Sequence, residues 1–591
     1  MDKNEQIFIY YCSLIIIIIY SRISLVKLHM SINTSTNINC NPLVILRPST
    51  IAPEKPHANQ FIKFTYPLDI FQHHSCISID NGEHTLVTAH TGSGKTVIAK
   101  YAIINTVKTL KKKVIYTSPI KTLSNQKYAE FRKELEEYEI EVGLMTGDNK
   151  INVEANCIIM TTEILRKMLY YSNNGTVNSN NINLQDVACV IFDEVHYIND
   201  IDRGKVWEEC ITMLSKDIML VMLSATIENS FEFASWIKNI KDRNVNLITT
   251  NRRIIPLKHY VFAKSYELNK ITNKKVGLEE KLFLIKDNED NFFDETYHTV
   301  YTNILLDQET NTWKHRLNSL VGYLQKHDMN QTIFFVLSRE GCETCAKSVL
   351  HTLIDTSDIA EVNHWFNYMF KSFEATYGKL EQVTTVKNLL MKGIAFHHSG
   401  LIPILKEIIE IIFQKGLIRI LFATETFAVG VNMPTRTVVF TSMSKPDNIS
   451  NKRLLYTSEY VQMAGRAGRR GIDTFGNCII LPLKEELPIL TEMKSLMLGK
   501  GLRLESKFKI DYNFILKALN SSNDINQVIS NTLYNHDIQK SIAFQEQQAN
   551  NKLVELNNYN FSTEDIQKIK EYRKIELDFQ NKENEKREIT N

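Results

Sequence analysis

Three short stretches of this chain carry residue types that could together perform phosphate chemistry. Residues 89–96 read AHTGSGKT, residues 193–196 read DEVH, and residues 462–471 read QMAGRAGRRG. Glycine-rich loops ending in lysine and threonine bind phosphate groups, and neighbouring carboxylates can hold Mg²⁺ and polarise water. Arginines can neutralise the charge of a phosphoryl group during its transfer. In this order, the three stretches predict a site that binds and hydrolyses ATP.

The first stretch has the local context that a phosphate loop requires. It lies between an apolar run at 85–88 and a helical pattern at 97–104, so it is predicted to join a strand to a helix N-terminus. The glycines allow backbone N–H groups to face phosphate oxygens. Lys95 can reach the β- and γ-phosphates, and the Thr96 hydroxyl can ligate Mg²⁺. The predicted nucleotide-contacting residues of the loop are Ala89, His90, Thr91, Gly92, Ser93, Gly94, Lys95 and Thr96.

The second stretch follows an apolar run at 187–192 that reads as a buried parallel strand. Ligands of open α/β sheets bind at the carboxyl ends of such strands. We therefore expect Asp193 to hold Mg²⁺ together with Thr96, and Glu194 to polarise the water that attacks the γ-phosphate.

The third stretch places Arg466 and Arg469 three residues apart, which on the first turn of a helix would direct both guanidinium groups to one side. They are predicted to act as arginine fingers, and Gln462 is suited to holding the same attacking water. Because they lie some 370 residues beyond the phosphate loop, two lobes must close on one ATP. The predicted catalytic residues are Lys95, Asp193, Glu194, Gln462, Arg466 and Arg469.

Composition narrows the class of protein. The 591 residues suggest several domains, and 43% hydrophobic content suffices for large cores. A net charge of +2 excludes a general attraction for nucleic acid, so any such binding would depend on a local basic groove. Nine scattered cysteines favour a reducing intracellular compartment. Cys342 and Cys345 have metal-ligand spacing without a matching second pair, so we expect them to pack one helix face after the strand at 332–337.

The N-terminus carries an apolar segment, residues 7–20, which is shorter than the roughly 20 residues that cross a bilayer. Asp2 and Glu5 make its preceding flank a poor signal for membrane insertion. We therefore expect a mis-assigned start, with Met30 as the alternative first residue, ahead of a disordered or partner-bound tail. A membrane anchor is the least favoured interpretation.

Four segments carry a resemblance to a known family: YPLDIFQ at 66–72, YTSPIKTLSNQ at 116–126, DEVHYI at 193–198 and FHHSGLIP at 396–403. Over roughly residues 64–580 the chain resembles the superfamily-two DExH-box RNA helicases of the superkiller and exosome-associated group. The resemblance implies an α/β fold with two tandem RecA-like parallel-sheet domains, then a mainly helical winged-helix region and a helical tail. The implied divisions are a leader (1–57), a first lobe (58–256), a connector with an insertion (257–316), a second lobe (317–484), a winged-helix-like region (485–549) and a partial stalk (550–591).

The resemblance also assigns roles to residues. It implies that Gln72 senses adenine while Tyr66 or Phe71 packs against the base. Residues 440–460 would form a hairpin that splits the duplex, or an inert surface hairpin. Residues implied to couple hydrolysis to lobe movement are His196, Ser224, Ala225, Thr226 and Gly430 with the two residues that follow it. Residues implied to contact RNA are Pro119, Lys121, Thr161, Thr162, Arg166, Ser338, Arg339, Thr424 and Glu425.

The resemblance implies an ATP-dependent RNA helicase that uses Mg²⁺, moves 3′ to 5′ on single-stranded RNA and unwinds duplexes in RNA processing or decay. Single-stranded or partly duplex RNA and the RNA-decay machinery are its expected partners. A DNA helicase of the same superfamily is one alternative. The other is an ATP-gated RNA clamp, because the family's arch tip and C-terminal ratchet bundle have no counterpart in the sequence.

Overall fold

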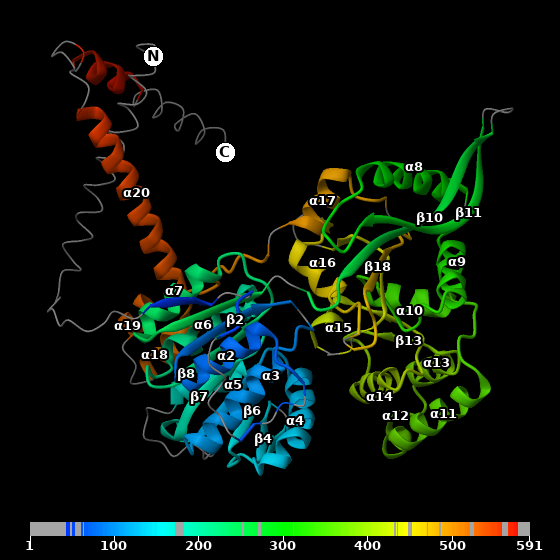
Figure 1. Ribbon diagram of the computed structural model, residues 1–591, viewed down its shortest axis with the longest axis horizontal. Helices are drawn as coiled ribbons and strands as arrows, with labels where there is room; N and C mark the ends of the chain where they lie inside the picture. The colour runs from blue at the N-terminus through cyan, green and yellow to red at the C-terminus, as the bar shows by residue number, and fades with distance from the viewer. Residues whose placement is uncertain are drawn as a thin grey trace. The chain divides into compact units, whose positions relative to one another are not determined.

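The computed structural model describes residues 43–576, apart from 48–49, 54–60, 63, 65, 91, 148, 172–182, 251–252, 270–273, 311, 431–432, 434, 447–451, 470, 484–485, 500, 521–524, 558–564 and 566. Residues 42–528 form one compact unit that contains two mostly parallel sheets flanked by helices (Figure 1). The expected pair of RecA-like α/β domains, followed by a helical region, is confirmed.

The first sheet has nine strands among the described residues, and all neighbours are parallel except the last pair. Its order is β1 (Val44–Arg47), β9 (Val245–Thr250), β2 (His84–Ala89), β8 (Met219–Ser224), β7 (Val187–Phe192), β3 (Lys113–Ser118), β6 (Cys157–Thr161), β4 (Val142–Met145) and β5 (Lys150–Ile151). Its helices are α2 (Ile70–Asp80), α3 (Thr96–Ile104), α4 (Lys121–Leu135), α5 (Thr162–Tyr171), α6 (Gly204–Met213) and α7 (Ser230–Lys241), with short helical turns η1 (Asn105–Thr109), η2 (Glu136–Tyr138), η3 (Leu184–Asp186) and η4 (Val195–Asn199).

Strand β1 lies in the stretch expected to be a leader. The four residues VILR pair in parallel with β9, and the Arg47 Nε donates to Asn246 Oδ1 at 2.8 Å. A four-residue apolar run between polar segments is too short to be distinguished from a loop by its pattern, since only pairing with β9 makes it a strand. Residues 1–42, including the apolar segment and Met30, lie outside the described residues.

The second sheet has seven strands among the described residues, in the order β11 (Lys274–Lys286), β10 (Leu257–Asn269), β18 (Gly476–Ile480), β15 (Thr437–Phe440), β12 (Thr332–Phe335), β14 (Ile420–Ala423) and β13 (Ile394–His397). Only β10 and β11 are antiparallel. Part of the expected connector, 257–286, thus belongs to this sheet. The helices are α8 (Asp294–Thr310), α9 (Trp313–Lys326), α10 (Arg339–Ser348), α11 (Thr356–Phe370), α12 (Glu374–Tyr377), α13 (Glu381–Leu390), α14 (Pro403–Gln414), α15 (Glu425–Gly430) and α16 (Thr457–Ala464), with the turn η5 (Lys371–Phe373).

Helix α14 shows how the sequence specifies these elements. Its proline stands at the first helical position, where the missing N–H costs nothing. Apolar residues at helical spacing then form one buried face, namely Ile404, Leu405, Ile408, Ile409, Ile412 and Phe413. Cys342 and Cys345, on α10, are buried in the same core, as the packing interpretation predicted.

Beyond the second sheet the chain returns to the first lobe. After α17 (Leu490–Leu498), residues 501–505 form a strap along the segments that follow β8 and η4. Asn229 and Asn199 each donate to one strap carbonyl and accept from one strap N–H, at 2.6–2.9 Å. Ile227 forms a parallel bridge with Leu502. Helices α18 (Tyr512–Asn520) and α19 (Ile525–Ser530) follow.

The chain beyond Ile529 belongs to a separate unit, which contains the long helix α20 (Leu533–Asn557). Across the described part of the chain, every helix is too short or too polar to span a bilayer.

A buried lysine in the first lobe gives a prediction about pH. Lys241, on α7, is 1% exposed and donates to the Leu214 carbonyl; burial, and then Lys216, lower its pKa to about 7. Between pH 7 and the ordinary lysine pKa of about 10.4, the unfolded chain binds more protons at this site than the folded chain. Its contribution therefore makes the free energy of unfolding rise with pH in that window. We expect the Lys241→Met variant to lose melting temperature relative to the wild-type protein as the pH rises from 7 to 9.5.

The control is Lys238→Met, on the same helix, whose melting temperature should keep a constant offset from wild type over this pH range. A constant offset for Lys241→Met as well would contradict the prediction.

Candidate functional site

The predicted first-lobe residues gather at one edge of the first sheet. Strands β2, β8, β7, β3 and β6 are consecutive neighbours and parallel, so their carboxyl ends meet. The phosphate loop follows β2, Asp193 follows β7, and Pro119 follows β3. Ser224 ends β8, which lies between the strand of the phosphate loop and the strand of the carboxylates. The strand order in the sheet thus differs from the order in the sequence. It places Ser224, the first residue of the predicted coupling segment 224–226, between the phosphate loop and the carboxylates.

The phosphate loop lines a cavity of about 310 Å³. Gly92 and Gly94 have φ of 81° and 86°, a left-handed conformation that residues with a Cβ rarely adopt. Lys95 Nζ donates to the carbonyl oxygens of Ala89 and His90 at 2.8 and 3.2 Å, which folds the side chain back over its own loop. Helix α3 begins at Thr96. Thr91 lies outside the described residues.

This loop fits a bound phosphate chain. The Ser93 hydroxyl is buried and has no hydrogen-bond partner among the described residues, although it lines the cavity. An unpaired buried hydroxyl costs free energy that a phosphate oxygen would recover. The N-terminus of α3 opens at the same place, where backbone N–H groups attract anions.

The two carboxylates are held differently. Asp193 accepts a hydrogen bond from the hydroxyl of Tyr116 on β3, the strand next to β7. Glu194 has φ of 55°, a left-handed conformation that is uncommon for a residue with a side chain. Such backbone conformations persist where the surrounding structure enforces them. Tyr116 was not predicted as a site residue, because its contact depends on which strands become neighbours.

The surroundings in the cavity shift the pKa values of the two carboxylates in opposite directions. Burial, and then Glu194, raise the pKa of Asp193 to about 6, so a nearby cation is needed to keep it ionised at lower pH. Burial alone would raise the pKa of Glu194, but His196, Lys95 and Arg466 together lower it below its ordinary value. A buried carboxylate that favours a cation, in the same cavity as Thr96, fits a Mg²⁺ site.

Of the residues predicted to couple hydrolysis to lobe movement, His196 links the carboxylates to the segment after β8. Burial lowers the pKa of His196, although the charge of Glu194 opposes this effect. Its Nδ1 accepts from the backbone N–H of Ala225 at 3.4 Å and lies 3.4 Å from Glu194 Oε2. The buried Ser224 hydroxyl has no partner among the described residues. Gly430 ends α15 in the second lobe, and residues 431–432 lie outside the described residues.

The expectation of a helix beneath the two arginines is wrong. Helix α16 ends at Ala464, before both arginines, and Gly468 has φ of 93°. A Cβ at Gly468 would lie 2.3 Å from the Ile255 side chain, so this loop requires glycine. The sequence pattern suggested a helix because spacing of three suits a helix and a turn equally.

The two arginines also face different surroundings. Arg466 is buried in the cavity with the phosphate loop and Glu194, and its Nη2 donates to the Ala428 carbonyl. Arg469 instead binds Asp473 through its Nε at 2.9 Å. Gln462 lines a neighbouring cavity of about 760 Å³, which also contains His90 and His196. The structure therefore places Arg466 in the phosphate cavity, Gln462 in a neighbouring cavity that His90 also lines, and Arg469 against Asp473.

Arg253, from the chain that leaves the first lobe, holds the arginine loop and was missed by the sequence analysis. Its Nη2 donates to the carbonyls of Gly465 and Ala467 at 2.8 and 3.1 Å, and its Nε donates to Ile255 at 2.8 Å. Backbone carbonyls as partners leave no pairwise signal in a sequence. The one signal in the sequence was its position in the segment that joins the two lobes, shortly before β10.

We expect Arg253→Gln to lower kcat for ATP hydrolysis by about 10²-fold with little change in KM, because a displaced arginine loop misplaces Arg466. Arg253→Lys should restore little, since a lysine cannot donate to three carbonyls in a fixed fork. Arg243→Gln, which removes an arginine bound to the Gly82 and Asp217 carbonyls, is the matched control. Steady-state kinetics would distinguish the cases, and a raised KM at unchanged kcat would instead assign Arg253 to nucleotide binding.

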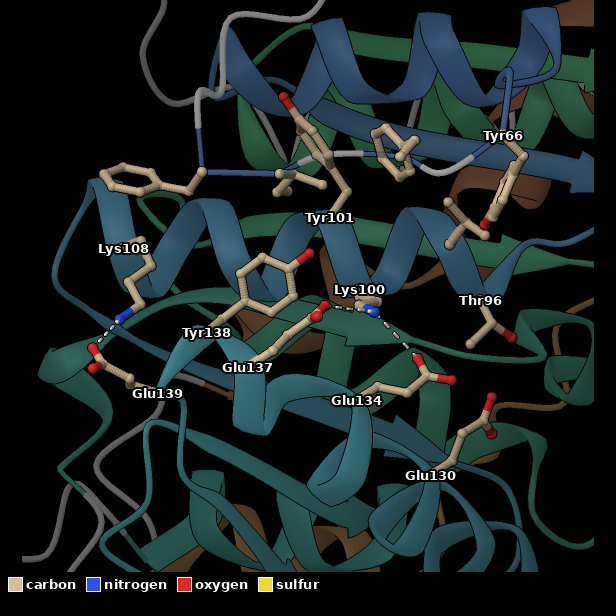
Figure 2. A pocket seen from close by; sticks show the side chains of 14 residues that line it. Tyr66, Thr96, Lys100, Tyr101, Lys108, Glu130, Glu134, Glu137, Tyr138 and Glu139 are labelled. Carbon is tan, nitrogen blue, oxygen red and sulfur yellow. Dashed lines mark hydrogen bonds and ion pairs between the residues drawn. The ribbon is translucent and has the colours of Figure 1, made fainter.

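A larger hollow, about 850 Å³, adjoins the phosphate cavity and shares Thr96 and Glu130 with it. Figure 2 shows that Tyr66 and Thr96 lie at one end and Lys108 and Glu139 at the other. Of the two aromatic candidates for stacking on adenine, Tyr66 lines this hollow and is 45% exposed. Phe71 is 5% exposed and packs in the core.

Gln72 is fully buried next to the phosphate loop. Its amide donates to the Gly94 carbonyl at 3.1 Å, and its Oε1 accepts from the Asp69 N–H at 2.9 Å. This side chain therefore fixes the phosphate loop to the start of α2, and one amide N–H remains for other partners.

In the first lobe, the residues predicted to contact RNA are mostly engaged within the protein. Arg203 donates to the Pro119 carbonyl and binds Glu163. Arg166 lies 3.5 Å from Glu209, and Thr161 and Thr162 are buried. Lys121 begins α4 with its ammonium near Gly147.

In the second lobe, the predicted RNA residues surround one cavity of about 260 Å³. Ser338, Arg339, Thr424 and Glu425 line it, together with Lys445. The Ser338 hydroxyl caps α10 by accepting from Gly341 N–H at 3.0 Å. Helix N-termini with hydroxyls and basic groups bind phosphates without reading sequence.

The expected hairpin is present. Strands β16 (Ser444–Lys445) and β17 (Arg453–Leu454) pair in antiparallel fashion, and of the residues between them, 447–451 lie outside the described residues. Lys445 and Arg453 both bind Glu459, on α16, at 2.6 and 2.7 Å. The hairpin base is thus tied to the helix that precedes the arginine loop.

Comparisons with known proteins agree with this arrangement. A family model described as DEAD/DEAH box helicase matches residues 70–233, and one described as helicase conserved C-terminal domain matches residues 366–471. The chain is 38% identical to DExH-box ATP-dependent RNA helicase DExH9 of Arabidopsis thaliana, over 90% of this chain and 53% of that protein. It is 39% identical to human superkiller complex protein 2 and to mouse exosome RNA helicase MTR4, over 77% and 79% of this chain. These matches cover 36% and 43% of the two relatives, so the chain spans about half, or less, of the length of these relatives.

Proposed function

We propose that this chain is a DEAD/DEAH box helicase, specifically an ATP-dependent RNA helicase that hydrolyses ATP between its two lobes, since family models for the two helicase domains match residues 70–233 and 366–471. Relatives named as RNA helicases, at 38–39% identity, support RNA as the substrate class. The proposed direction of movement on single-stranded RNA is 3′ to 5′, with a role in RNA processing or decay inside the cell.

The observation that carries this proposal is the position of Arg466. This residue of the second lobe lines the same cavity as Lys95 and Glu194 of the first lobe. An arginine that faces a phosphate loop can stabilise charge on the γ-phosphoryl group as it leaves. Because the arginine and the phosphate loop are on different sheets, lobe closure and catalytic competence become one event.

Within this proposal, each side chain has a defined task. Lys95 binds the β- and γ-phosphates, and Glu194 accepts hydrogen bonds from the attacking water and orients it. Mg²⁺ would be held by Thr96 and Asp193 and would supply neutralisation of the phosphate charge. Residues around Ser338 and Thr424 would bind the RNA backbone.

The proposal is tested by measuring ATP hydrolysis without nucleic acid, with single-stranded RNA and with single-stranded DNA of the same sequence. The same samples are then assayed for strand displacement from duplexes with 3′ or 5′ overhangs. The expected result is stimulation by RNA over DNA, with displacement only from the 3′ overhang. Stronger stimulation of ATP hydrolysis by DNA than by RNA would indicate a DNA helicase. Stimulation by RNA without strand displacement would indicate an ATP-gated RNA clamp.

A further inference from the structure

A second lysine lies in the phosphate cavity, and none of the motifs accounts for it. Lys127, on α4, is 3% exposed and lines the same 310 Å³ cavity as Lys95. Its ammonium donates to Thr96 Oγ1 at 3.2 Å and to Glu130 Oε2 at 2.8 Å, and it lies 5.7 Å from the centre of the Phe131 ring.

A buried ammonium group needs anionic or polar partners close by, because its removal from water is otherwise very costly. Lys127 has the Thr96 hydroxyl on one side and the Glu130 carboxylate on the other. It also lines the same cavity as Asp193. The ammonium is therefore hydrogen-bonded to Thr96 and shares a cavity with Asp193, and these are the two side chains proposed to ligate Mg²⁺.

We propose that Lys127 is a positioning residue that competes with Mg²⁺ for the oxygens of Thr96 and Asp193, and that Glu130 receives the ammonium when the metal ion binds. A monovalent and a divalent cation repel each other strongly at contact distance in a partly buried site. The inference rests on the proposed function, since it assumes that Thr96 and Asp193 ligate Mg²⁺.

Two properties follow from this competition. First, the cavity that Asp193 lines contains a cation whether or not Mg²⁺ is bound. Second, the affinity for Mg²⁺ is reduced by the free energy needed to move the ammonium from Thr96 toward Glu130. Glu130 suits this role because it already contacts Lys127 and lies where the two cavities meet; Figure 2 shows it at the same end of the hollow as Thr96.

The experiment measures binding of a fluorescent ADP analogue to the full chain while Mg²⁺ is titrated, and so requires no hydrolysis. We expect Lys127→Met to lower the Mg²⁺ concentration at half-maximal binding by about tenfold or more. Lys133→Met is the matched control, because Lys133 lies on the exposed face of the same helix. This control should leave the midpoint unchanged.

Glu130→Gln provides a second variant with the opposite expected result. The neutral amide holds the ammonium less firmly, so Lys127 should compete more strongly and the Mg²⁺ midpoint should rise several-fold. If Lys127→Met does not fold, as its melting curve would show, this variant still decides the proposal.

Three results would overturn the proposal or its premise. An unchanged Mg²⁺ midpoint in both variants would refute competition. Weaker ADP binding in EDTA for Lys127→Met, at an unchanged midpoint, would assign Lys127 to direct phosphate contact. Absence of any nucleotide binding by the wild-type chain would instead refute the proposed function, which separates the two failures.

Discussion

Glu194→Gln is expected to reduce the rate of ATP hydrolysis by about 10²–10⁴-fold while ATP still binds, since a positioned general base contributes an effect of that size. The carboxylate is prepared for this role by its surroundings. His196, Lys95 and Arg466 together keep the pKa of Glu194 below its ordinary value although it is buried. A glutamine of the same shape removes the charge and leaves the space filled.

The measurement is a single-turnover assay of phosphate release, combined with fluorescent nucleotide binding. Glu163→Gln is the matched control, because it replaces another partly buried carboxylate of the first lobe, one that binds Arg203 away from the phosphate cavity. Loss of binding together with hydrolysis would mean that Glu194 supports the nucleotide site as a whole.

Arg466→Gln has the second large expected effect, a loss of about 10³–10⁵-fold in kcat, the range over which arginine fingers act. Burial lowers the pKa of this guanidinium to about 10, opposed by Glu194, so it carries its charge at neutral pH. Arg466 is placed where that charge can act on the γ-phosphoryl group, because it shares a cavity with the phosphate loop.

Arg469→Gln is the control that the structure offers, since Arg469 is three residues away but is bound to Asp473. We expect a smaller loss for this variant, measured by steady-state ATP hydrolysis under saturating RNA. An equal loss in both variants would show that Arg469 leaves Asp473 during the reaction, and would restore the prediction of two fingers.

Much of the candidate site could be predicted because its residues follow recognisable apolar strands. A run such as 187–192 identifies a buried strand, and whatever follows it must lie at a sheet edge. The backbone conformation of the phosphate loop requires its glycines, so this loop can be predicted from its own sequence alone. These are local properties of the sequence.

Other parts of the site depend on contacts between distant segments. Tyr116 binds Asp193 only because β3 is the neighbour of β7, and Arg253 binds backbone carbonyls that any sequence would supply. Lys127 is one lysine in an amphipathic helix, and its pattern there does not differ from that of a surface lysine. Residue spacing also gave a wrong prediction for the arginine loop. The spacing of Arg466 and Arg469 suits a helix, but the chain there forms a turn in which Gly468 has a left-handed conformation.

The strap of residues 501–505 has a mechanical consequence for the two lobes. The chain passes between them twice, once near Arg253 and once through the strap, which is anchored by Asn199 and Asn229. The strap bridge at Ile227 lies one residue beyond Thr226, so the strap is attached to the segment that follows β8, the strand between the phosphate loop and the carboxylates.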